Sequence, residues 1–192
     1  MINRREFLQV GIAAIPLVTL PSSAFAVEVA AVPLYKVIFD ERFAASVAFA
    51  AEARRLGASV QAIRGDITDI WYNDLYHRWQ QSPVAIAGLT TNRSLFCLDM
   101  FARDVWMRVV HHADHRILAD SSVEHEVFGP EGVRQTAVLK RAGANWSAEA
   151  AKLVMRFPET GRRPVGKTAD LLIPAKAPQP LVSWVIGPVK RA

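Results

Sequence analysis

Short apolar runs alternate with segments of helical period over residues 34–112, and this alternation limits the folds open to the chain. Val37, Ile38 and Phe39 are consecutive, as in a strand that is buried on both faces. The pattern predicts strands at 34–40, 59–64, 83–89 and 108–112, and helices at 41–56, 66–81 and 93–104. Because strands joined by helices pair in parallel through right-handed crossovers, we expect a doubly wound α/β fold. Its sheet would be mostly parallel and Rossmann-like or flavodoxin-like, with four to five strands and helices on both faces.

The pattern weakens after residue 120. Residues 123–128 and 133–139 flank Gly129 and Gly132, which predicts a hairpin. Ser147 is expected to open a helix that runs to about residue 157. Prolines then punctuate residues 158–180, and a strand-like apolar run follows at 181–186. We therefore expect one α/β domain over residues 27–192, with a proline-rich segment at 158–180.

The first 26 residues have a charged start, an apolar stretch and small residues at Ala24 and Ala26, which predicts a cleavable signal peptide. Arg4 and Arg5 are followed by one residue and then by Phe and Leu, so the segment resembles a twin-arginine (Tat) signal. This resemblance implies export of the folded protein to a bacterial periplasm. An ordinary secretory signal is the alternative. The apolar stretch is too short to span a bilayer, so no membrane span is expected after cleavage.

Charge and motifs exclude several classes of function. Loss of residues 1–26 removes Arg4, Arg5 and Glu6 and lowers the net charge from +5 to +4. Export makes nucleic acid an unexpected partner despite this charge. The dinucleotide motif G-x-G-x-x-G does not occur, which disfavours dinucleotides, whereas residues 161–168, GRRPVGKT, match G-x-x-x-x-G-K-[ST] and fall in the proline-rich segment. The single cysteine, Cys97, cannot hold an iron–sulfur cluster and is expected to be buried in a helix. We predict no cofactor.

Polar side chains follow the expected strands. In an open parallel sheet, ligands bind beyond the carboxyl ends of the strands. Guanidinium groups and helix N-termini at such an edge favour a carboxylate or phosphate. The predicted ligand-binding residues are Arg64, Thr90, Thr91 and Arg93. The alternatives are that Asp40, Asp66 and Thr91 only cap helices and that the arginines are surface residues.

Histidines follow the fourth expected strand. His112 could act as a general acid or base, with Asp66 or Asp40 to orient it. His111 and His115 are four residues apart, and on a strand they would be separated by roughly 13 Å. We therefore predict no metal site for this cluster, and a bend at the strand end that brings the imidazoles together is the alternative. No G-x-S-x-G sequence supplies a nucleophile.

Two functions fit these features. The first is a Tat-exported periplasmic accessory subunit or small-anion-binding protein without its own redox cofactor. Its partner would be a co-exported protein or a small anionic ligand. The second is a small periplasmic hydrolase, lyase or isomerase that acts on an organic anion through His112 and an aspartate. The enzyme requires His112 and a carboxylate within about 3 Å of each other in a concave pocket.

Overall fold

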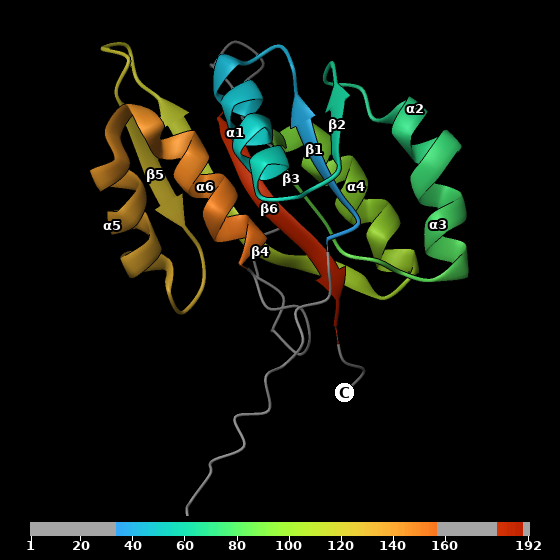
Figure 1. Cartoon of the computed structure of the whole chain (residues 1–192). Helices are drawn as coiled ribbons and strands as arrows, with labels where there is room; N and C mark the ends of the chain where they lie inside the picture. Colours follow the sequence, from blue (N-terminus) through green and yellow to red (C-terminus); the bar gives the residue numbers. More distant parts are fainter. Residues whose placement is uncertain (1–33, 157–179, 190–192) are drawn as a thin grey trace, which may run out of the picture.

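The computed structural model describes residues 34–156 and 180–189, and there six strands form one sheet in the order β2-β1-β3-β6-β4-β5 (Figure 1). The strands are β1 (Lys36–Asp40), β2 (Val60–Ile63), β3 (Ile86–Thr91), β4 (Met107–Ile117), β5 (Val123–Val127) and β6 (Leu181–Pro188). The helices are α1 (Ala44–Arg55), α2 (Thr68–Ile70), α3 (Tyr76–Gln81), α4 (Asn92–Asp104), α5 (Gly132–Ala142) and α6 (Trp146–Met155). A π-helical turn, η1 (Trp71–Leu75), joins α2 to α3, and a 3-10 turn, η2 (Gly143–Asn145), joins α5 to α6. The predicted signal peptide and residues 158–179 of the predicted proline-rich segment lie outside the described residues.

The predicted elements between residues 34 and 104 are confirmed, but the predicted arrangement of the sheet is wrong. β1 pairs in parallel with β2 and with β3. β6 lies between β3 and β4 and is antiparallel to both, and β5 is antiparallel to β4. The sheet is therefore mixed and mostly antiparallel, with six strands, and is not the doubly wound, mostly parallel sheet of four to five strands. The apolar run at 181–186 indicates a central strand, but hydrophobic periodicity carries no information on strand direction or neighbours.

The predicted hairpin of 123–128 with 133–139 is also wrong. β4 continues to Ile117, five residues beyond the predicted strand end, and pairs with β5. The turn between them is stabilised by Asp120, whose Oδ1 accepts hydrogen bonds from the backbone N (2.9 Å) and the Oγ (2.6 Å) of Ser122. Residues 132–142 form α5 instead of a strand. Gly129, with φ of +109°, lies between β5 and this helix.

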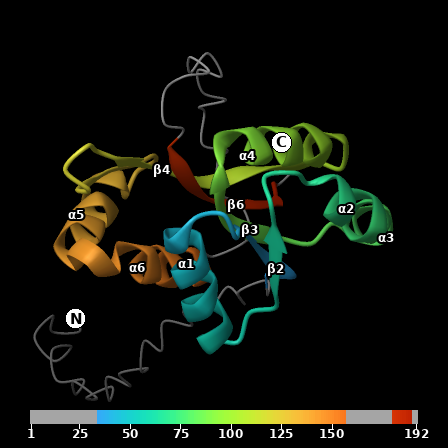
Figure 2. The ribbon, with the colours of Figure 1, turned by 90° about the horizontal axis from the view of Figure 1, so that it is seen from above.

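Each face of the sheet has its own apolar core. On one face, Phe49 of α1 and Ala150 of α6 pack with Val37 and Leu89 of the sheet. On the other face, α4 and the α2–α3 segment pack on side chains that include Ile38 and Trp184. Figure 2 shows α1 and α6 on one side of β3 and β6, and α4 on the opposite side.

The cysteine differs from its prediction. Cys97 lies on α4 but is exposed, so the expected burial is wrong. Its helical neighbours Leu95 and Leu98 face the core, and the helical period turns residue 97 away from it. Among the helices of the described residues, none has the length and apolar character needed to cross a membrane.

The packing of Trp184 on Gly88 joins the two parts of the sheet. Trp184 of β6 is fully buried and stands directly across from Gly88 of β3. A Cβ atom at residue 88 would lie 2.6 Å from Cζ2 of Trp184 and 2.3 Å from the carbonyl oxygen of Ile38. The indole Nε1 donates a hydrogen bond to Oγ1 of Thr90 at 3.0 Å. Only glycine allows the indole to lie this close to β3.

We expect Gly88→Ala to lower the free energy of unfolding by about 1–3 kcal/mol, because the added methyl group overpacks the sheet. Gly187→Ala is the matched control on β6. A Cβ atom there would meet Val110 Cγ2 at 3.6 Å and Ala85 Cβ at 3.9 Å, which are ordinary contacts. Urea denaturation of both variants measures the difference. Equal stability of the two variants would contradict the close contact at Gly88.

Candidate functional site

A pocket of about 870 Å³ opens at the edge of the sheet where β1, β2 and β3 end. Three arginines, Arg42, Arg64 and Arg93, line this pocket together with the carboxylate of Asp66. The remaining lining residues are Phe43, Gly65, Thr91, Ile117, Leu118 and Ala119. We call this the arginine pocket. It combines several positive charges with an apolar wall.

Strand direction brings these residues to one edge. β4 runs in the same direction as β3, because both strands are antiparallel to β6. The end of β4 at Ile117 therefore reaches the edge where β3 ends at Thr91. Four of the predicted site residues meet in the pocket, namely Arg64, Asp66, Thr91 and Arg93. Asp40, Thr90 and His112 are not among its lining residues.

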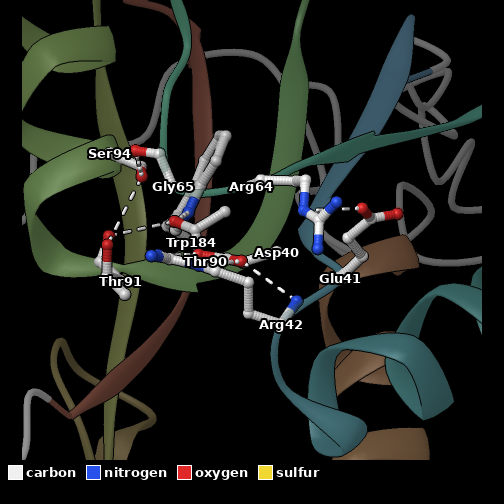
Figure 3. A network of polar contacts seen from close by, with 9 residues as sticks. All are labelled: Asp40, Glu41, Arg42, Arg64, Gly65, Thr90, Thr91, Ser94 and Trp184. Atoms are coloured by element: carbon white, nitrogen blue, oxygen red, sulfur yellow. Dashed lines mark hydrogen bonds and ion pairs between the residues drawn. The ribbon is translucent and has the colours of Figure 1, made fainter.

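Asp40 holds Arg42 at the rim of the pocket. The carboxylate of Asp40 is fully buried and accepts hydrogen bonds from Nε (2.9 Å) and Nη2 (2.6 Å) of Arg42 (Figure 3). This hydrogen-bonded pair raises the pKa of the Arg42 guanidinium. Gly65 has φ of +83°, which favours glycine, and a Cβ atom there would lie 2.2 Å from Nη2 of Arg42 and displace the guanidinium. Asp40 thus positions a cation, a role different from the predicted orientation of His112.

Arg64 and Arg93 are more exposed than Asp40. The Nε of Arg64 lies 3.3 Å from Oε1 of Glu41, and the Arg64 side chain is 80% exposed (Figure 3). Arg93 is exposed in the first turn of α4. Both side chains are thus accessible from solvent at the pocket.

Thr91 occupies the N-cap position of α4, but its side chain makes no capping hydrogen bond. Its Oγ1 instead lies 3.3 Å from Oγ of Ser94, which donates to the carbonyl oxygen of Gly65 at 3.1 Å (Figure 3). These hydroxyl groups tie the start of α4 to the loop after β2. The N-terminus of α4 borders the pocket at Thr91 and Arg93, and a helix N-terminus favours an anion.

Asp66 lies one residue before the N-cap position of α2, which is Ile67, and its carboxylate binds the first residue of that helix. Its Oδ1 accepts hydrogen bonds from the backbone N (2.8 Å) and Oγ1 (2.7 Å) of Thr68. The hydrogen bond from the Thr68 hydroxyl is the main cause of a lowered pKa for Asp66. Asp66 is therefore ionised at neutral pH and supplies the one negative charge among the lining residues.

Thr90 is buried and has a structural role. Its Oγ1 accepts the hydrogen bond from Trp184 and donates to the carbonyl oxygen of Thr91 at 3.1 Å. This hydroxyl group is therefore committed to the fold, and Thr91 and Arg93 are the residues from this strand end that reach the pocket.

His112 lies inside the sheet. In the sheet, His112 stands opposite Trp184 of β6, and Trp184 stands opposite Gly88 of β3. Gly88 is three residues before the end of β3, so His112 lies about 10 Å along the strands from the pocket edge. Its Nε2 lies 2.9 Å from Oδ1 of Asp114, without the alignment that a hydrogen bond needs. The carboxylate beside His112 is thus that of Asp114, whereas Asp40 binds Arg42 and Asp66 binds Thr68.

His111, His112 and His115 lie on β4, and His125 lies on the neighbouring strand β5. Within residues 34–156 and 180–189, no group of three or more His, Cys, Asp or Glu side chains could hold a metal ion. His111 and His112 follow each other on β4, where successive side chains point to opposite faces.

Sequence reasoning missed the apolar wall at Ile117, Leu118 and Ala119, because it ended the fourth strand at His112. A signal was present in the alternating residues of 123–127 and in the turn-forming Asp120, Ser121 and Ser122. Together they indicate a hairpin whose first strand continues to Ile117.

We expect Arg42→Ala to lower the free energy of unfolding by about 1.5–3 kcal/mol, because it leaves the buried Asp40 carboxylate without its guanidinium hydrogen bonds. Arg64→Ala removes only an exposed ion pair and should cost less than about 1 kcal/mol. Adding Asp40→Asn to Arg42→Ala should recover part of the loss. Chemical denaturation of the three variants provides the test. Equal stability of Arg42→Ala and Arg64→Ala would show that Asp40 does not depend on Arg42.

Comparison of the chain with models of protein families, with curated proteins and with solved structures finds no match.

Proposed function

We propose that the protein binds a small organic anion, a carboxylate or a phosphate, in the arginine pocket. The observation that carries this proposal is the convergence of Arg42, Arg64 and Arg93 on one pocket whose lining includes a single carboxylate, Asp66. A pocket with this balance of charge attracts anions.

The three arginines support the proposal in different ways. Arg42 is held in place by Asp40 and presents an ordered guanidinium at the rim. Arg64 and Arg93 are exposed and line the same pocket from the ends of β2 and β3. Because a guanidinium can donate two parallel hydrogen bonds to a carboxylate or phosphate, two such groups orient the ligand as well as attract it.

The apolar wall supports a ligand with an organic body. Phe43 lies beside the arginines, and Ile117, Leu118 and Ala119 complete the opposite part of the lining. Small-molecule sites combine an apolar lining with a few polar groups that set orientation. An organic acid or an organic phosphate fits this combination better than an inorganic ion.

The acid–base alternative has less support. His112 is 3% exposed and is not among the lining residues of the arginine pocket. Its carboxylate neighbour is Asp114, and a general base must reach the proton that it removes from a substrate. A hydrolase, lyase or isomerase that uses His112 would therefore need a rearrangement of β4.

Export through the twin-arginine pathway to the periplasm is the second part of the proposal. It depends on Arg4 and Arg5 in the N-terminal motif. A folded exported protein with a preformed ligand pocket suits this pathway, which carries folded proteins. The accessory-subunit alternative rests on the same motif, because such signals are also used by proteins that leave the cytoplasm with a partner.

We expect Arg93→Ala and Arg64→Ala each to weaken the binding of an organic anion by about 10- to 150-fold, since a hydrogen bond to a charged group contributes about 1.5–3 kcal/mol. Titration calorimetry with inorganic phosphate and a panel of mono-, di- and tricarboxylates measures the effect. Arg134→Ala, an exposed arginine on α5, is the matched control. Absence of binding by every anion, or equal binding by all variants, would refute the proposal.

We expect the double substitution Arg4→Lys and Arg5→Lys to keep the protein in the cytoplasm, because the resemblance to Tat signals implies that the arginine pair is read directly. Cell fractionation of the wild-type and variant chains measures this. The double lysine variant preserves the basic start that a general secretory signal requires. Undiminished periplasmic protein in the variant would therefore assign the segment to the general pathway.

A further inference from the structure

A second pocket, of about 550 Å³, lies between the β4–β5 hairpin and the corner where α5 meets α6. Its polar lining includes His125 of β5 and Lys140 of α5. Ile117, Val123 and Trp146 are apolar members of its lining. We call it the His125 pocket. One lining residue, Ile117, is common to this pocket and the arginine pocket.

His125 is the outer member of a buried chain of hydrogen-bonding groups. Its Nδ1 lies 2.9 Å from Nδ1 of His115, and Nε2 of His115 lies 2.9 Å from Oγ of Ser183 on β6. His115 is fully buried, Ser183 is 1% exposed and His125 is 7% exposed. The Trp146 ring packs against both imidazoles, with centroids 4.4 Å from His115 and 5.2 Å from His125. Packing and hydrogen bonds therefore hold the imidazole of His125 in one orientation.

Both imidazoles are favoured in the neutral form. Burial, followed by the neighbouring histidines, holds the pKa of His115 well below its ordinary value. Burial and the charge of Lys140 lower the pKa of His125. Each neutral imidazole carries one N–H, so only one proton lies between the two Nδ1 atoms.

This proton count leaves two arrangements. In the first, Ser183 donates to Nε2 of His115, Nδ1 of His115 donates to His125, and His125 carries its proton on Nε2. In the second, His115 donates from Nε2 to Ser183, and His125 donates from Nδ1 and has a bare Nε2. Because Nδ1 of His125 is engaged inside the protein, Nε2 is the nitrogen that serves the pocket. It can donate or accept a hydrogen bond without a change in the charge of the chain.

We propose that the His125 pocket is a second ligand site, which binds a small monocarboxylate with an apolar body. The ligand carboxylate would accept a hydrogen bond from Nε2 of His125 and pair with the ammonium of Lys140. A nine-tenths buried imidazole that faces a pocket next to a cation provides these two contacts together. Its apolar body would contact Val123, Trp146 and Ile117.

The surroundings favour a single negative charge on this ligand. His125 and Lys140 also line a smaller pocket of about 160 Å³, together with Arg116 and the carboxylates of Asp114, Glu124 and Glu126. Three carboxylates face two cations in this lining, since Arg116 pairs with Glu124, and the excess negative charge disfavours a dianion near Lys140. A monocarboxylate is therefore preferred here, whereas the arginine pocket has enough cations for a more highly charged ligand.

The test uses benzoate as the probe and the imidazole nitrogen signals of the full chain in ¹H–¹⁵N NMR spectra at pH 7. We expect saturable shifts of the His125 signals, with the proton held on Nε2 in the bound state. Lys140→Met should weaken this titration by about 10-fold. Arg141→Met is the matched control, because it removes a neighbouring exposed charge of α5 that is not in the pocket lining, and it should leave the titration unchanged.

Two further variants sharpen the result. Ser183→Ala removes the hydroxyl group at the inner end of the hydrogen-bonded series Ser183–His115–His125. It should change the proportion of the two His125 tautomers without removing the pocket. Arg93→Ala should leave the His125 titration unchanged, which separates this site from the arginine pocket. His125 signals that do not respond to benzoate, or that respond equally in Lys140→Met, would overturn the proposal whether or not the arginine pocket binds anions.

Discussion

The contact between Trp184 and Gly88 is the packing interaction on which the rest of the structure depends. It seats β6 against β3, and the hydrogen bond from the indole to Thr90 completes the contact. With β6 in place, its other edge receives β4. The direction of β4 follows, since it must be antiparallel to β6. Both candidate sites depend on this placement of β4, because each uses residues at the end of β4 or in the hairpin that follows it.

Charge at the arginine pocket is organised by a buried carboxylate. Asp40 has no exposure to solvent and would be costly to bury without a cationic partner. Arg42 supplies this partner and remains partly exposed, with 45% of its side chain accessible. The pair therefore fulfils two requirements: it satisfies a charge inside the fold, and it orders one cation at the pocket. Arg64 and Arg93 are exposed, so their substitution disturbs the buried core less than that of Arg42.

The β4–β5 hairpin separates two pockets of different character. On one side, several cations and an apolar wall favour an organic anion. On the other side, a neutral imidazole and one lysine favour a singly charged ligand. Ile117 contributes to both linings, so a ligand in one pocket contacts a residue that also borders the other.

Local features were predictable from the sequence, because they depend on residues close together in the chain. Helical period located α1 and α4, and runs of apolar residues located β1 and β3. The sequence placed Arg64, Thr91 and Arg93 at the ends of expected parallel strands. Because β1, β2 and β3 are parallel, these three residues do lie at one edge of the sheet. The interior position of His112 could not be predicted, because it depends on where β4 ends and on which strand pairs with it.

The sequence by itself thus determined which segments are strands and helices over most of the first half of the chain, and which polar groups end those strands. Tertiary structure alone decided the order and direction of the sheet. Thr90 and Trp184 are 94 residues apart in the sequence. Their contact depends on the absence of a side chain at Gly88 of β3, which leaves room for the indole. The hydrogen bond between His115 and Ser183 spans 68 residues and likewise joins β4 to β6. Such contacts leave no periodic signal in the sequence, because they depend on complementary shapes and hydrogen bonds between segments that meet only in the folded chain.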